Sequence, residues 1–430
     1  MRGVANKGLL PEDALRLGLA ASHAFGGTIL IGRDTRLSGE MLSRALCAGA
    51  ASGGADVVDL GILPTPGIAA LVPQLGATAA GVVSASHNPY PDNGIKYFSG
   101  EGRKLSPQKE REIESLLGRD LKRPTGSGIG TIEVLGDAAQ LYAVWVLGRL
   151  RPSAEGIKVL LDCANGAAFE VAPLVFGEIG VDLTLTGAEP TGTNINEGCG
   201  STHVDELDAS GYDVAFAFDG DADRVLAVDE KGNVVDGDRI IAIIARDKKE
   251  RGVLAGEVVV TVMSNLGFFK AMETMEIPYE VTDVGDRHVA EAMGRLRSSL
   301  GGEQSGHVIL SEHVTTGDGI VTALALLDVM ARSGRPLSEL AGAMEVYPQT
   351  LINVRVEEPE AAKAVAASEV VALAISEAER TLGEEGRVLL RPSGTEPVVR
   401  VMVEHTDETV CREVCEEISR AVHDAGKEGT

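Results

Sequence analysis

The sequence predicts an α/β protein of several domains, in which three related α/β segments precede a smaller α+β segment. Three observations support this fold class. Apolar runs of strand length alternate with stretches of helical period. The order strand, polar loop, helix and second strand occurs three times, and the pattern changes after about residue 350. A chain of 430 residues is also too long for one hydrophobic core.

The first strand of each repeat ends in a polar loop that in most cases contains glycine. These strands are expected at Thr28–Gly32, Lys158–Asp162 and Val258–Met263. A helical stretch and a second strand follow each time, with the second strands at Gly54–Gly61, Gly180–Gly187 and Ile277–Gly285. Strands that alternate with helices in this way are typical of parallel β-α-β units.

Domain boundaries are expected where charged residues, glycine or proline interrupt the pattern, near Arg149–Glu155, Asp247–Leu254 and Tyr347–Thr350. They divide the chain into residues 1–150, 151–250, 251–347 and 348–430. In the last segment we expect one long Ala-rich helix over Glu360–Glu379. A strand–loop–strand unit in Arg387–Glu404 and a final helix follow.

The composition excludes several classes of function. The net charge is −25, from 39 basic and 64 acidic residues, which disfavours binding to nucleic acid or to an anionic membrane. No apolar run reaches the roughly 18 residues of a membrane span, and the first residues lack the apolar core of a signal peptide. The five cysteines form no zinc-like pair, so we expect free thiols in a cytoplasmic protein.

A serine in a tight polar loop is the first candidate for chemistry. Ser86 lies in the segment Ser84–Lys96, directly after the apolar run Gly81–Val83. A switch from strand to loop exposes a hydroxyl at the end of a sheet, where catalytic groups are commonly mounted. Serine-rich turns are mostly structural, so this candidate depends on three further loops. Ser86 lies in no Gly-x-Ser-x-Gly turn, which argues against a serine hydrolase.

Three closely spaced aspartates are the second candidate: Asp219, Asp221 and Asp223. Carboxylates at every second position of an extended loop can converge on one hard cation. An EF-hand calcium loop is excluded, because Arg224 stands where its sharp turn needs glycine and because the flanks, Val214–Phe218 and Val225–Val228, are strand-like. A solvated acidic turn is the other alternative. Three carboxylates between apolar strands favour a divalent metal, with Mg²⁺ first because a phosphate oxygen would complete its octahedron.

The third loop, Gly301–His307, is suited to a sugar. Its glycines leave the backbone close to a ligand, and Glu303, Ser305 and His307 are expected to alternate onto one side. An acceptor, a hydroxyl and an imidazole together suit the hydroxyl groups of a sugar. Taken alone, His307 would be interpreted as an ordinary buried histidine.

The fourth loop, Arg391–Pro397, is suited to a phosphate group. Two hydroxyls flank a glycine, and arginines stand at Arg391 and Arg400. No Walker A motif occurs, so a nucleotide is not implied. One interpretation uses all four loops: a phosphoryl group on Ser86 passes to a sugar phosphate while Mg²⁺ neutralises the developing charge.

These four loops, in this order and over essentially the whole chain, resemble the α-D-phosphohexomutase superfamily. Within it the chain is most similar to the bacterial-type phosphoglucosamine mutases, because Gln304 replaces the methionine that is usual in phosphomannomutase/phosphoglucomutase relatives. Further segments that resemble this subfamily are Arg2–Asn6, Asp34–Met41, Asn194–Asn196 and Gly200–His203. The resemblance implies four domains around a central cleft, three with related mixed α/β cores and a smaller C-terminal α+β domain.

The resemblance also implies residue roles. Ser86 is the phosphoserine of the active form, and one Mg²⁺ per subunit is held by an oxygen of that phosphoserine and by Asp219, Asp221 and Asp223. The expected neighbours of the phosphoserine are Lys96, Arg224 and Arg2, with Lys96 as general acid/base. The residues expected to bind substrate are His87, Glu303, Ser305, His307, Arg391, Ser393, Gly394, Thr395 and Arg400.

The implied reaction interconverts glucosamine 6-phosphate and glucosamine 1-phosphate through a bisphosphorylated sugar, and it feeds amino-sugar nucleotide and cell-wall precursor synthesis. The partner is thus a hexosamine phosphate, with no nucleic acid and no membrane, and the subfamily suggests a homodimer. The main alternative is a phosphomannomutase/phosphoglucomutase of broader hexose-phosphate specificity. A non-catalytic sugar-phosphate binding protein and a phosphatase are further alternatives.

The N-terminus departs from the family pattern. The family usually opens with a strand and a Gly-Thr-Asp-Gly-Ile segment directly before the arginine that corresponds to Arg2, whereas this chain starts at Met1-Arg2. The start is either mis-assigned or truncated. Loss of that strand is expected to leave a sheet edge bare and Arg2 poorly anchored.

Overall fold

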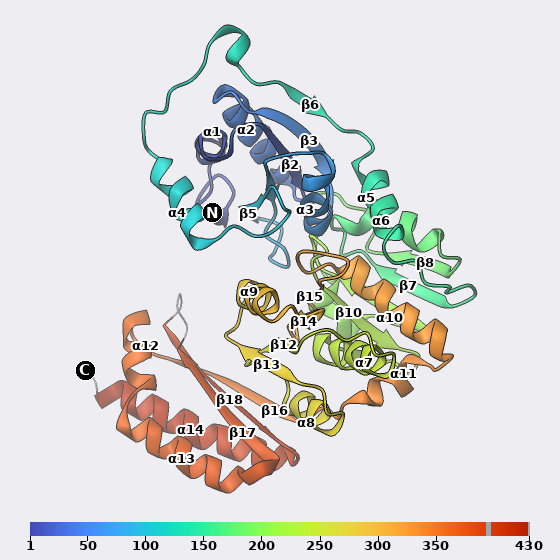
Figure 1. Ribbon diagram of the computed structural model, residues 1–430. Coiled ribbons are helices and arrows are strands. Elements are labelled where there is room, and N and C mark those ends of the chain that lie inside the picture. The colour runs from blue at the N-terminus through green and yellow to red at the C-terminus, as the bar shows by residue number, and fades with distance from the viewer. Residues whose placement is uncertain (393–396, 429–430) are drawn as a thin grey trace. The chain divides into compact units, whose positions relative to one another are not determined.

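The computed structural model describes residues 1–392 and 397–428 (Figure 1). It contains two compact units, each described by itself below. The first comprises Met1–Met263 and Met275–Ala343, and the second comprises Ser264–Thr274 and Met344–Thr430. Three of the four sheets belong to the first unit, and the fourth belongs to the second.

The first sheet has the order β1-β5-β4-β2-β3-β6. Its strands are β1 (Arg2–Val4), β2 (Thr28–Arg33), β3 (Asp56–Ile62), β4 (Ala79–Val83), β5 (Asp92–Ser99) and β6 (Ile132–Val134). β2, β3, β4 and β6 are joined in parallel, whereas β5 and β1 pair antiparallel at one edge. The helices of this segment are α1 (Pro11–Phe25), α2 (Leu37–Ser52), α3 (Thr65–Gln74), α4 (Pro107–Leu116) and α5 (Ala138–Leu147).

The buried middle of strand β2, residues 29–32, is apolar because helices cover both faces of this sheet. Ile29 and Ile31 pack in one core cluster with Leu42 of α2. On the opposite face, a Cβ at Gly32 would meet the side chain of Ile68 of α3. Successive side chains of a strand point to opposite faces, so the sheet is the middle layer between two layers of helices.

The second and third sheets repeat this plan with fewer strands. The second has the order β11-β10-β9-β7-β8, and the third has the order β13-β12-β14-β15. Parallel pairs form their centres, and antiparallel strands follow at one edge. The strands are β7 (Lys158–Asp162), β8 (Asp182–Thr186), β9 (Val214–Phe218), β10 (Val225–Asp229), β11 (Val234–Val235), β12 (Val258–Thr261), β13 (Tyr279–Thr282), β14 (Leu300–Gly302) and β15 (Val308–Leu310).

The helices of these two segments include α6 (Ala168–Gly177), α7 (Gly237–Glu250), α9 (Asp286–Leu296), α10 (Gly319–Ser333) and the short α11 (Leu337–Leu340). The six strands predicted for the repeats correspond to β2, β3, β7, β8, β12 and β13. The parallel pairing of each predicted pair is confirmed. Apolar runs flanked by polar loops were thus a sufficient signal for the three repeats.

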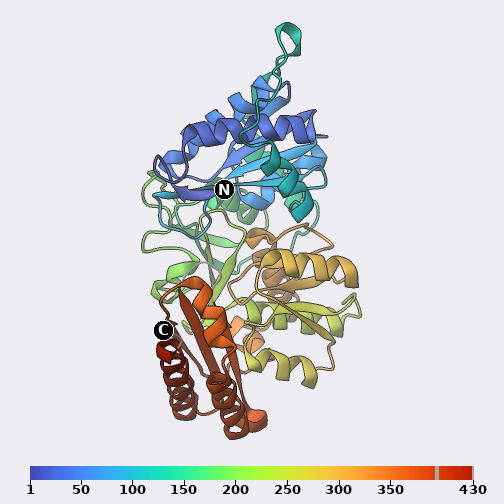
Figure 2. The same ribbon diagram turned by 90° about the vertical axis from the view of Figure 1, so that its left-hand side faces the viewer.

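The second unit holds an antiparallel sheet, β16-β18-β17. Its strands are β16 (Gln349–Arg355), β17 (Gly386–Pro392) and β18 (Val398–His405), and its helices are α8 (Leu266–Thr274), α12 (Pro359–Ala366), α13 (Glu369–Leu382) and α14 (Glu408–Glu428). Figures 1 and 2 show α13 and α14 side by side along this sheet. The predicted α/β class with a C-terminal α+β segment is confirmed.

One long helix over 360–379 was a wrong prediction. The segment forms α12 and α13, separated at Ala367–Ser368. Ser368 is the N-cap of α13, and its side chain accepts a hydrogen bond from the N–H of Val371. Serine competes for backbone N–H groups and therefore starts helices better than it continues them. The Ala-rich composition on both sides concealed this start.

The cysteines are free, as predicted. Cys47, Cys163, Cys411 and Cys415 are buried, and Cys199 is partly buried. Cys411 and Cys415 lie on the face of α14 that packs in the core of the second unit. No helix within residues 1–392 and 397–428 is long and apolar enough to cross a membrane.

Candidate active site

Ser86 lies just beyond the carboxyl end of β4, in the loop that leads to β5. It is 8% exposed and has a φ of 51°, in the left-handed region that residues other than glycine seldom adopt. Its hydroxyl donates a hydrogen bond of 2.5 Å to Oδ2 of Asp219. Its N–H donates to Oγ of Ser84 at 2.9 Å. The predicted nucleophile therefore touches the first aspartate of the predicted metal loop.

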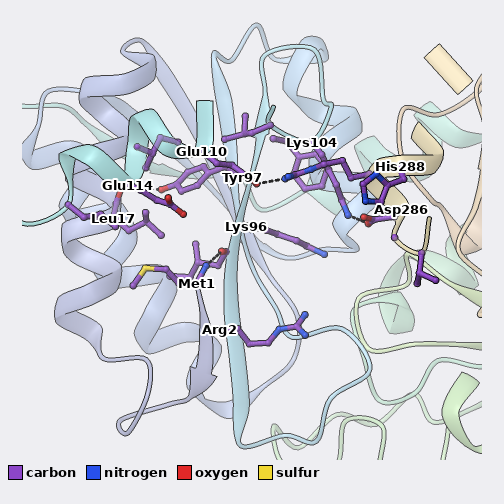
Figure 3. Close-up of a pocket in the computed structure, with 18 residues that line it drawn as sticks. Met1, Arg2, Leu17, Lys96, Tyr97, Lys104, Glu110, Glu114, Asp286 and His288 are labelled. Carbon is purple, nitrogen blue, oxygen red and sulfur yellow. Dashed lines mark hydrogen bonds and ion pairs between the residues drawn. The ribbon is translucent and has the colours of Figure 1, made fainter. Parts of the chain in front are cut away.

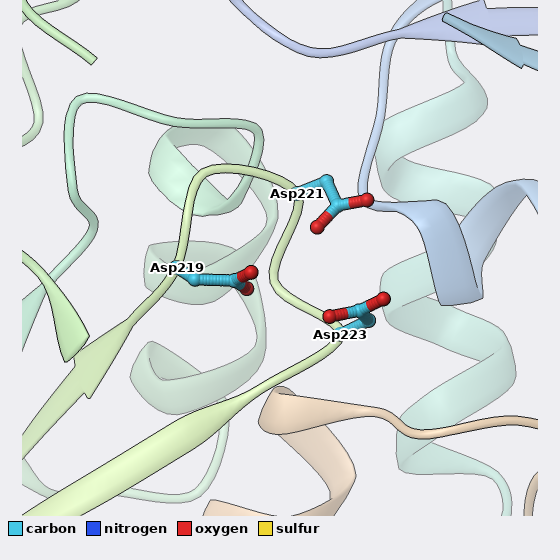
Figure 4. Close-up of side chains that lie close together, drawn as sticks. All are labelled: Asp219, Asp221 and Asp223. Atoms are coloured by element: carbon cyan, nitrogen blue, oxygen red, sulfur yellow. The ribbon is translucent and has the colours of Figure 1, made fainter. Parts of the chain in front are cut away.

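The three aspartates converge. Asp219 follows β9, Asp223 precedes β10, and Ala222 between them has a φ of 55°, which turns the chain sharply. All three carboxylates are buried, and one oxygen from each lies within 4.8 Å of the others. Figure 4 shows the three side chains turned toward one another. This cluster is consistent with binding of a divalent cation.

The hydrogen bonding of the cluster fits a cation. Oδ1 of Asp221 and Oδ1 of Asp223 are buried and have no hydrogen-bond partner among the described residues. A buried acceptor without a partner is costly, and a hard cation would supply the missing interaction. Burial raises the pKa of Asp219 well above its usual range, and the charges of Asp223 and Asp221 raise it further. Oxygen donors that repel one another in this way are the set that Mg²⁺ prefers.

Lys96 is held by the same loop. It lies in β5, and its Nζ is 2.7 Å from Oδ2 of Asp221 and 3.7 Å from Oδ2 of Asp223. Burial alone would lower the pKa of Lys96, but the two carboxylates outweigh it and raise that pKa. Burial would likewise raise the pKa of Asp221, yet the ammonium of Lys96 lowers it. Arg224 completes this set, with its Nε 3.8 Å from Oδ1 of Asp223.

The expectation that Arg2 would be poorly anchored is wrong for its backbone. Arg2 lies in β1, which is itself the edge strand, and it pairs with Gly94 of β5. The amino group of Met1 donates to the carbonyl of Ile95 at 3.0 Å, and the N–H of Ile95 donates back to the carbonyl of Met1 at 2.9 Å. The short strand therefore covers the edge of β5. Figure 3 shows the side chains of Arg2 and Lys96 reaching out on the same side.

Arg2 and Lys96 line a pocket of about 630 Å³. Lys104 and Asp286 on its wall form an ion pair (Figure 3). Burial lowers the pKa of Lys104 to about 8, and the charge of Lys96 adds to this effect. Sequence reasoning gave Lys104 and Asp286 no role, because neither belongs to one of the four loops. His87, predicted to bind substrate, has its Nδ1 3.4 Å from the hydroxyl of Ser86.

The predicted sugar loop is a tight turn between β14 and β15 rather than an extended segment. The N–H of Glu303 donates to the carbonyl of His307 at 3.0 Å, which closes the turn. Glu303 and His307 therefore face each other across a hairpin, while Ser305 at its tip is exposed. Oε1 of Glu303 accepts from the N–H of Gly285 at 3.0 Å, and Nε2 of His307 lies 3.7 Å from Oδ2 of Asp286. Glu303 and His307 thus lie on the same side of the hairpin because they pair across it, which their spacing in the sequence did not predict.

The predicted phosphate loop belongs to the second unit. Arg391 of β17 and Arg400 of β18 are directly opposite each other in the antiparallel sheet. The neighbours of Arg400, Val399 and Val401, belong to the core, so the arginines lie on the other face of the sheet. Ser393, Gly394 and Thr395, predicted for the same site, lie outside the described residues.

Thr65 is a further residue of the site that sequence reasoning missed. Its hydroxyl donates to Oδ2 of Asp221 at 2.6 Å, and its N–H donates to the carbonyl of Asp221 at 3.0 Å. Thr65 starts α3, shortly after the carboxyl end of β3. Polar residues at the carboxyl ends of parallel strands commonly gather at one edge of the sheet, which is the signal that would have found it.

Comparison with known proteins was consistent with this geometry. Four family models match, described as phosphoglucomutase/phosphomannomutase α/β/α domains I, II and III and the C-terminal domain. They match residues 1–123, 149–232, 236–347 and 351–421. Our domain divisions at 150, 250 and 347 stay predictions.

A phosphoglucosamine mutase of Rubrobacter xylanophilus is 69% identical over 431 residues, covering 100% of this chain and 97% of that protein. A phosphoglucosamine mutase of Moorella thermoacetica is 50% identical, covering 95% of this chain and 94% of that protein. The chain belongs to the phosphohexomutase superfamily and is of the phosphoglucosamine mutase type. The family predicted from the four loops is thus confirmed, and the chain is an isomerase that works by phosphoryl transfer.

Solved structures of this superfamily share the fold. A phosphoglucomutase/phosphomannomutase family protein of Burkholderia thailandensis has a TM-score of 0.82 at 24% identity, covering 99% of this chain and 96% of that chain. An N-acetylphosphoglucosamine mutase of Aspergillus fumigatus, solved with GlcNAc-6P and magnesium, has a TM-score of 0.67 at 20% identity. That match covers 84% of this chain and 93% of that chain.

Proposed function

We propose that this phosphohexomutase interconverts glucosamine 6-phosphate and glucosamine 1-phosphate. The observation that carries the proposal is the contact between the Ser86 hydroxyl and a cluster of three buried carboxylates. A serine so placed can carry a phosphoryl group next to a cation, as transfer through a phosphoserine requires. The choice of glucosamine is supported by relatives named phosphoglucosamine mutase at 48–69% identity.

The residues of the site have separate roles in the first phosphoryl transfer. Asp219, Asp221 and Asp223 would hold one Mg²⁺ together with an oxygen of the phosphoserine, and this ion would neutralise charge on the transferred group. The bond between Ser86 Oγ and phosphorus breaks as a sugar hydroxyl forms the new bond. Lys96 donates a proton to the leaving oxygen and then accepts the proton of the attacking hydroxyl, which returns it to its charged form. Arg224 and Arg2 add positive charge beside the phosphoryl group.

The second transfer runs in reverse on the other end of the sugar. The first transfer leaves a bisphosphorylated sugar and a free Ser86, so the sugar must turn over before its other phosphate returns to the serine. Glu303, Ser305 and His307 would bind the sugar hydroxyls, and His87 would contact the substrate beside Ser86. The non-reacting phosphate would bind to Arg391, Ser393, Gly394, Thr395 and Arg400. One such site per subunit, in a cytoplasmic homodimer, is part of the proposal.

A coupled assay with Mg²⁺ tests the substrate, comparing glucosamine, glucose and mannose phosphates. The proposal expects the highest kcat/KM on glucosamine phosphates. Intact-mass spectrometry tests the intermediate, because a phosphoserine adds about 80 Da. Ser86→Ala should remove that fraction and all turnover, whereas Ser115→Ala, on the exposed surface of α4, should retain both. Full mutase activity of Ser86→Ala protein would refute the mechanism.

A broader hexose-phosphate mutase is the second candidate, favoured by the description of all four family models as phosphoglucomutase/phosphomannomutase. It predicts comparable kcat/KM on glucose and glucosamine phosphates. The same assay distinguishes two other classes. A phosphatase would release inorganic phosphate without forming the isomer, and a binding protein would show neither turnover nor the phosphoserine mass.

A further inference from the structure

Arg36 is a buried arginine at the start of α2 that the proposed reaction does not use. Its side chain has no exposed surface, and it lies just beyond the carboxyl end of β2. An arginine carries five side-chain N–H donors in a rigid planar fork. Burying this charge is expensive unless the whole group is paired. The hydrogen-bond partners of Arg36 therefore indicate which part of the structure it stabilises.

All five donors of Arg36 are used. Nε donates to Oδ2 of Asp34 at 2.9 Å. The other four donors bind backbone carbonyl oxygens at distances between 2.5 and 3.1 Å: those of Ser86, Asn88 and Pro89 in one loop, and that of Asp92, the first residue of β5. This loop is the segment between β4 and β5 that carries the candidate nucleophile. The guanidinium thus replaces the backbone partners that an irregular loop lacks.

Asp34, the ion-pair partner of Arg36, is linked to the backbone N–H of Ser86. Its Oδ2 also accepts from the hydroxyl of Ser84 at 2.7 Å, and that hydroxyl in turn accepts from the N–H of Ser86. The N–H of Ser86 is therefore tied to Asp34 through Ser84, and its carbonyl is tied to Arg36 directly. Both peptide groups that flank the serine are held by one buried ion pair. A left-handed φ at a serine is strained, and it persists only where surrounding bonds hold the backbone in this way.

The carbonyl of Ser86 also contacts two loops of the second segment, one that carries Asn196 and one that carries the aspartates. Nδ2 of Asn196 donates to it at 2.9 Å, and a Cβ at Gly220 would lie 2.7 Å from it. The atom that Arg36 holds is thus a contact point between the serine loop and the aspartate loop. A shift of this carbonyl would move the hydroxyl of Ser86 relative to Asp219.

We propose that Arg36 is a positioning residue for phosphoryl transfer: with Asp34 it fixes the backbone of Ser86 so that the hydroxyl points at the carboxylate cluster. The inference rests on the proposed function. It assigns Arg36 no contact with substrate. Its loss should therefore affect the transfer step and leave substrate binding nearly unchanged. A misplacement of about 1 Å at a reacting group can lower the rate by about 100-fold.

Arg36→Lys tests the proposal, because lysine keeps the charge but offers at most three donors to the five acceptors. The control is Arg44→Lys in the same helix, where the side chain is 58% exposed. We expect Arg36→Lys to lower kcat by about 100-fold with KM within about twofold, and to slow phosphorylation of Ser86 by a hexose bisphosphate, followed by intact mass. The control should match the wild type.

A second variant keeps the test decisive if Arg36→Lys folds poorly. Ser84→Ala removes the link between Asp34 and the N–H of Ser86 but leaves the guanidinium in place, and it should also lower kcat selectively. The proposal is overturned if a folded variant keeps the wild-type kcat, or if kcat falls only in step with the folded fraction measured by circular dichroism. Lack of mutase activity in the wild type would instead refute the proposed function.

Discussion

The hydroxyl of Ser86 and the carboxylate of Asp219 are joined by a hydrogen bond of 2.5 Å, although 133 positions separate them in the chain. The contact brings the loop after β4 to the loop after β9. Both loops leave the carboxyl ends of parallel strands, the position at which open α/β sheets place their ligands. The candidate nucleophile and the candidate cation site therefore lie together.

Removal of one carboxylate should change the response to Mg²⁺. Asp223→Asn replaces one charged oxygen ligand by a neutral one and removes one of three buried charges that repel one another, so we expect it to melt at or above the wild-type temperature in EDTA. Saturating Mg²⁺ should raise the melting temperature of the wild type, since 100 times Kd adds about 2.7 kcal/mol to the free energy of unfolding. Saturating Mg²⁺ should raise the melting temperature of the variant much less. Asp208→Asn, at an exposed aspartate, serves as control, and an equal gain in both variants would contradict the assignment.

Gly220→Ala should impair catalysis more than folding. A Cβ at this position would lie 2.7 Å from the carbonyl of Ser86, so the serine loop and the aspartate loop must separate. We expect kcat to fall at least about tenfold, since small displacements at a reacting group are costly. Gly294→Ala is the matched control, because a Cβ there meets nothing within 4 Å. At this exposed position of α9 the alanine should stabilise the protein by about 0.5–1 kcal/mol. Unchanged kcat in the first variant would exclude tight packing of the two loops.

Tyr142→Phe should destabilise the first unit. The hydroxyl of Tyr142 donates to a buried carboxylate oxygen of Asp318, and Asp318 caps α10 by accepting from the N–H of Val321 at 3.0 Å. Loss of the hydroxyl leaves a buried charged acceptor without this donor, at a cost of about 1–3 kcal/mol in the free energy of unfolding. Urea denaturation measures the loss. Tyr90→Phe, at a residue that is 43% exposed, should cost little, and equal effects would show that the buried bond is not responsible.

His307 should make stability depend on pH. Burial lowers the pKa of His307 to about 4 in the folded state, against about 6.5 in the unfolded chain. Between these values the unfolded state binds a proton that the folded state does not. The contribution of His307 to the free energy of unfolding therefore falls as the pH falls from 6.5 to 4, and it is constant above 6.5. We expect the difference between wild type and His307→Gln to change by up to about 1.4 kcal/mol per pH unit in that window. The partly exposed His203 provides the control, as His203→Gln. Parallel curves for wild type and His307→Gln would disprove the effect.

Much of this molecule could be predicted from local sequence patterns. The strand that precedes Ser86 and the two strands around Asp219–Asp223 are apolar runs with polar ends, and they were expected at the observed places. The start of α13 at Ser368 was missed because an Ala-rich context outweighed one capping residue. The bonds of Arg36 to the loop were also missed. They join a side chain to backbone groups 50 to 56 positions away. Every residue has a backbone carbonyl, so the sequence does not indicate which of them a distant side chain will bind.

The conformation of Ser86 has a consequence for the proposed phosphoserine. Its left-handed backbone and its bond to Asp219 direct the hydroxyl into a space already lined by carboxylates. A phosphoryl group attached there would add between one and two further negative charges, and like charges in a buried space are costly. The fraction of the enzyme that is loaded with phosphate would therefore depend on cation supply as well as on sugar supply, and depletion of Mg²⁺ would favour its discharge.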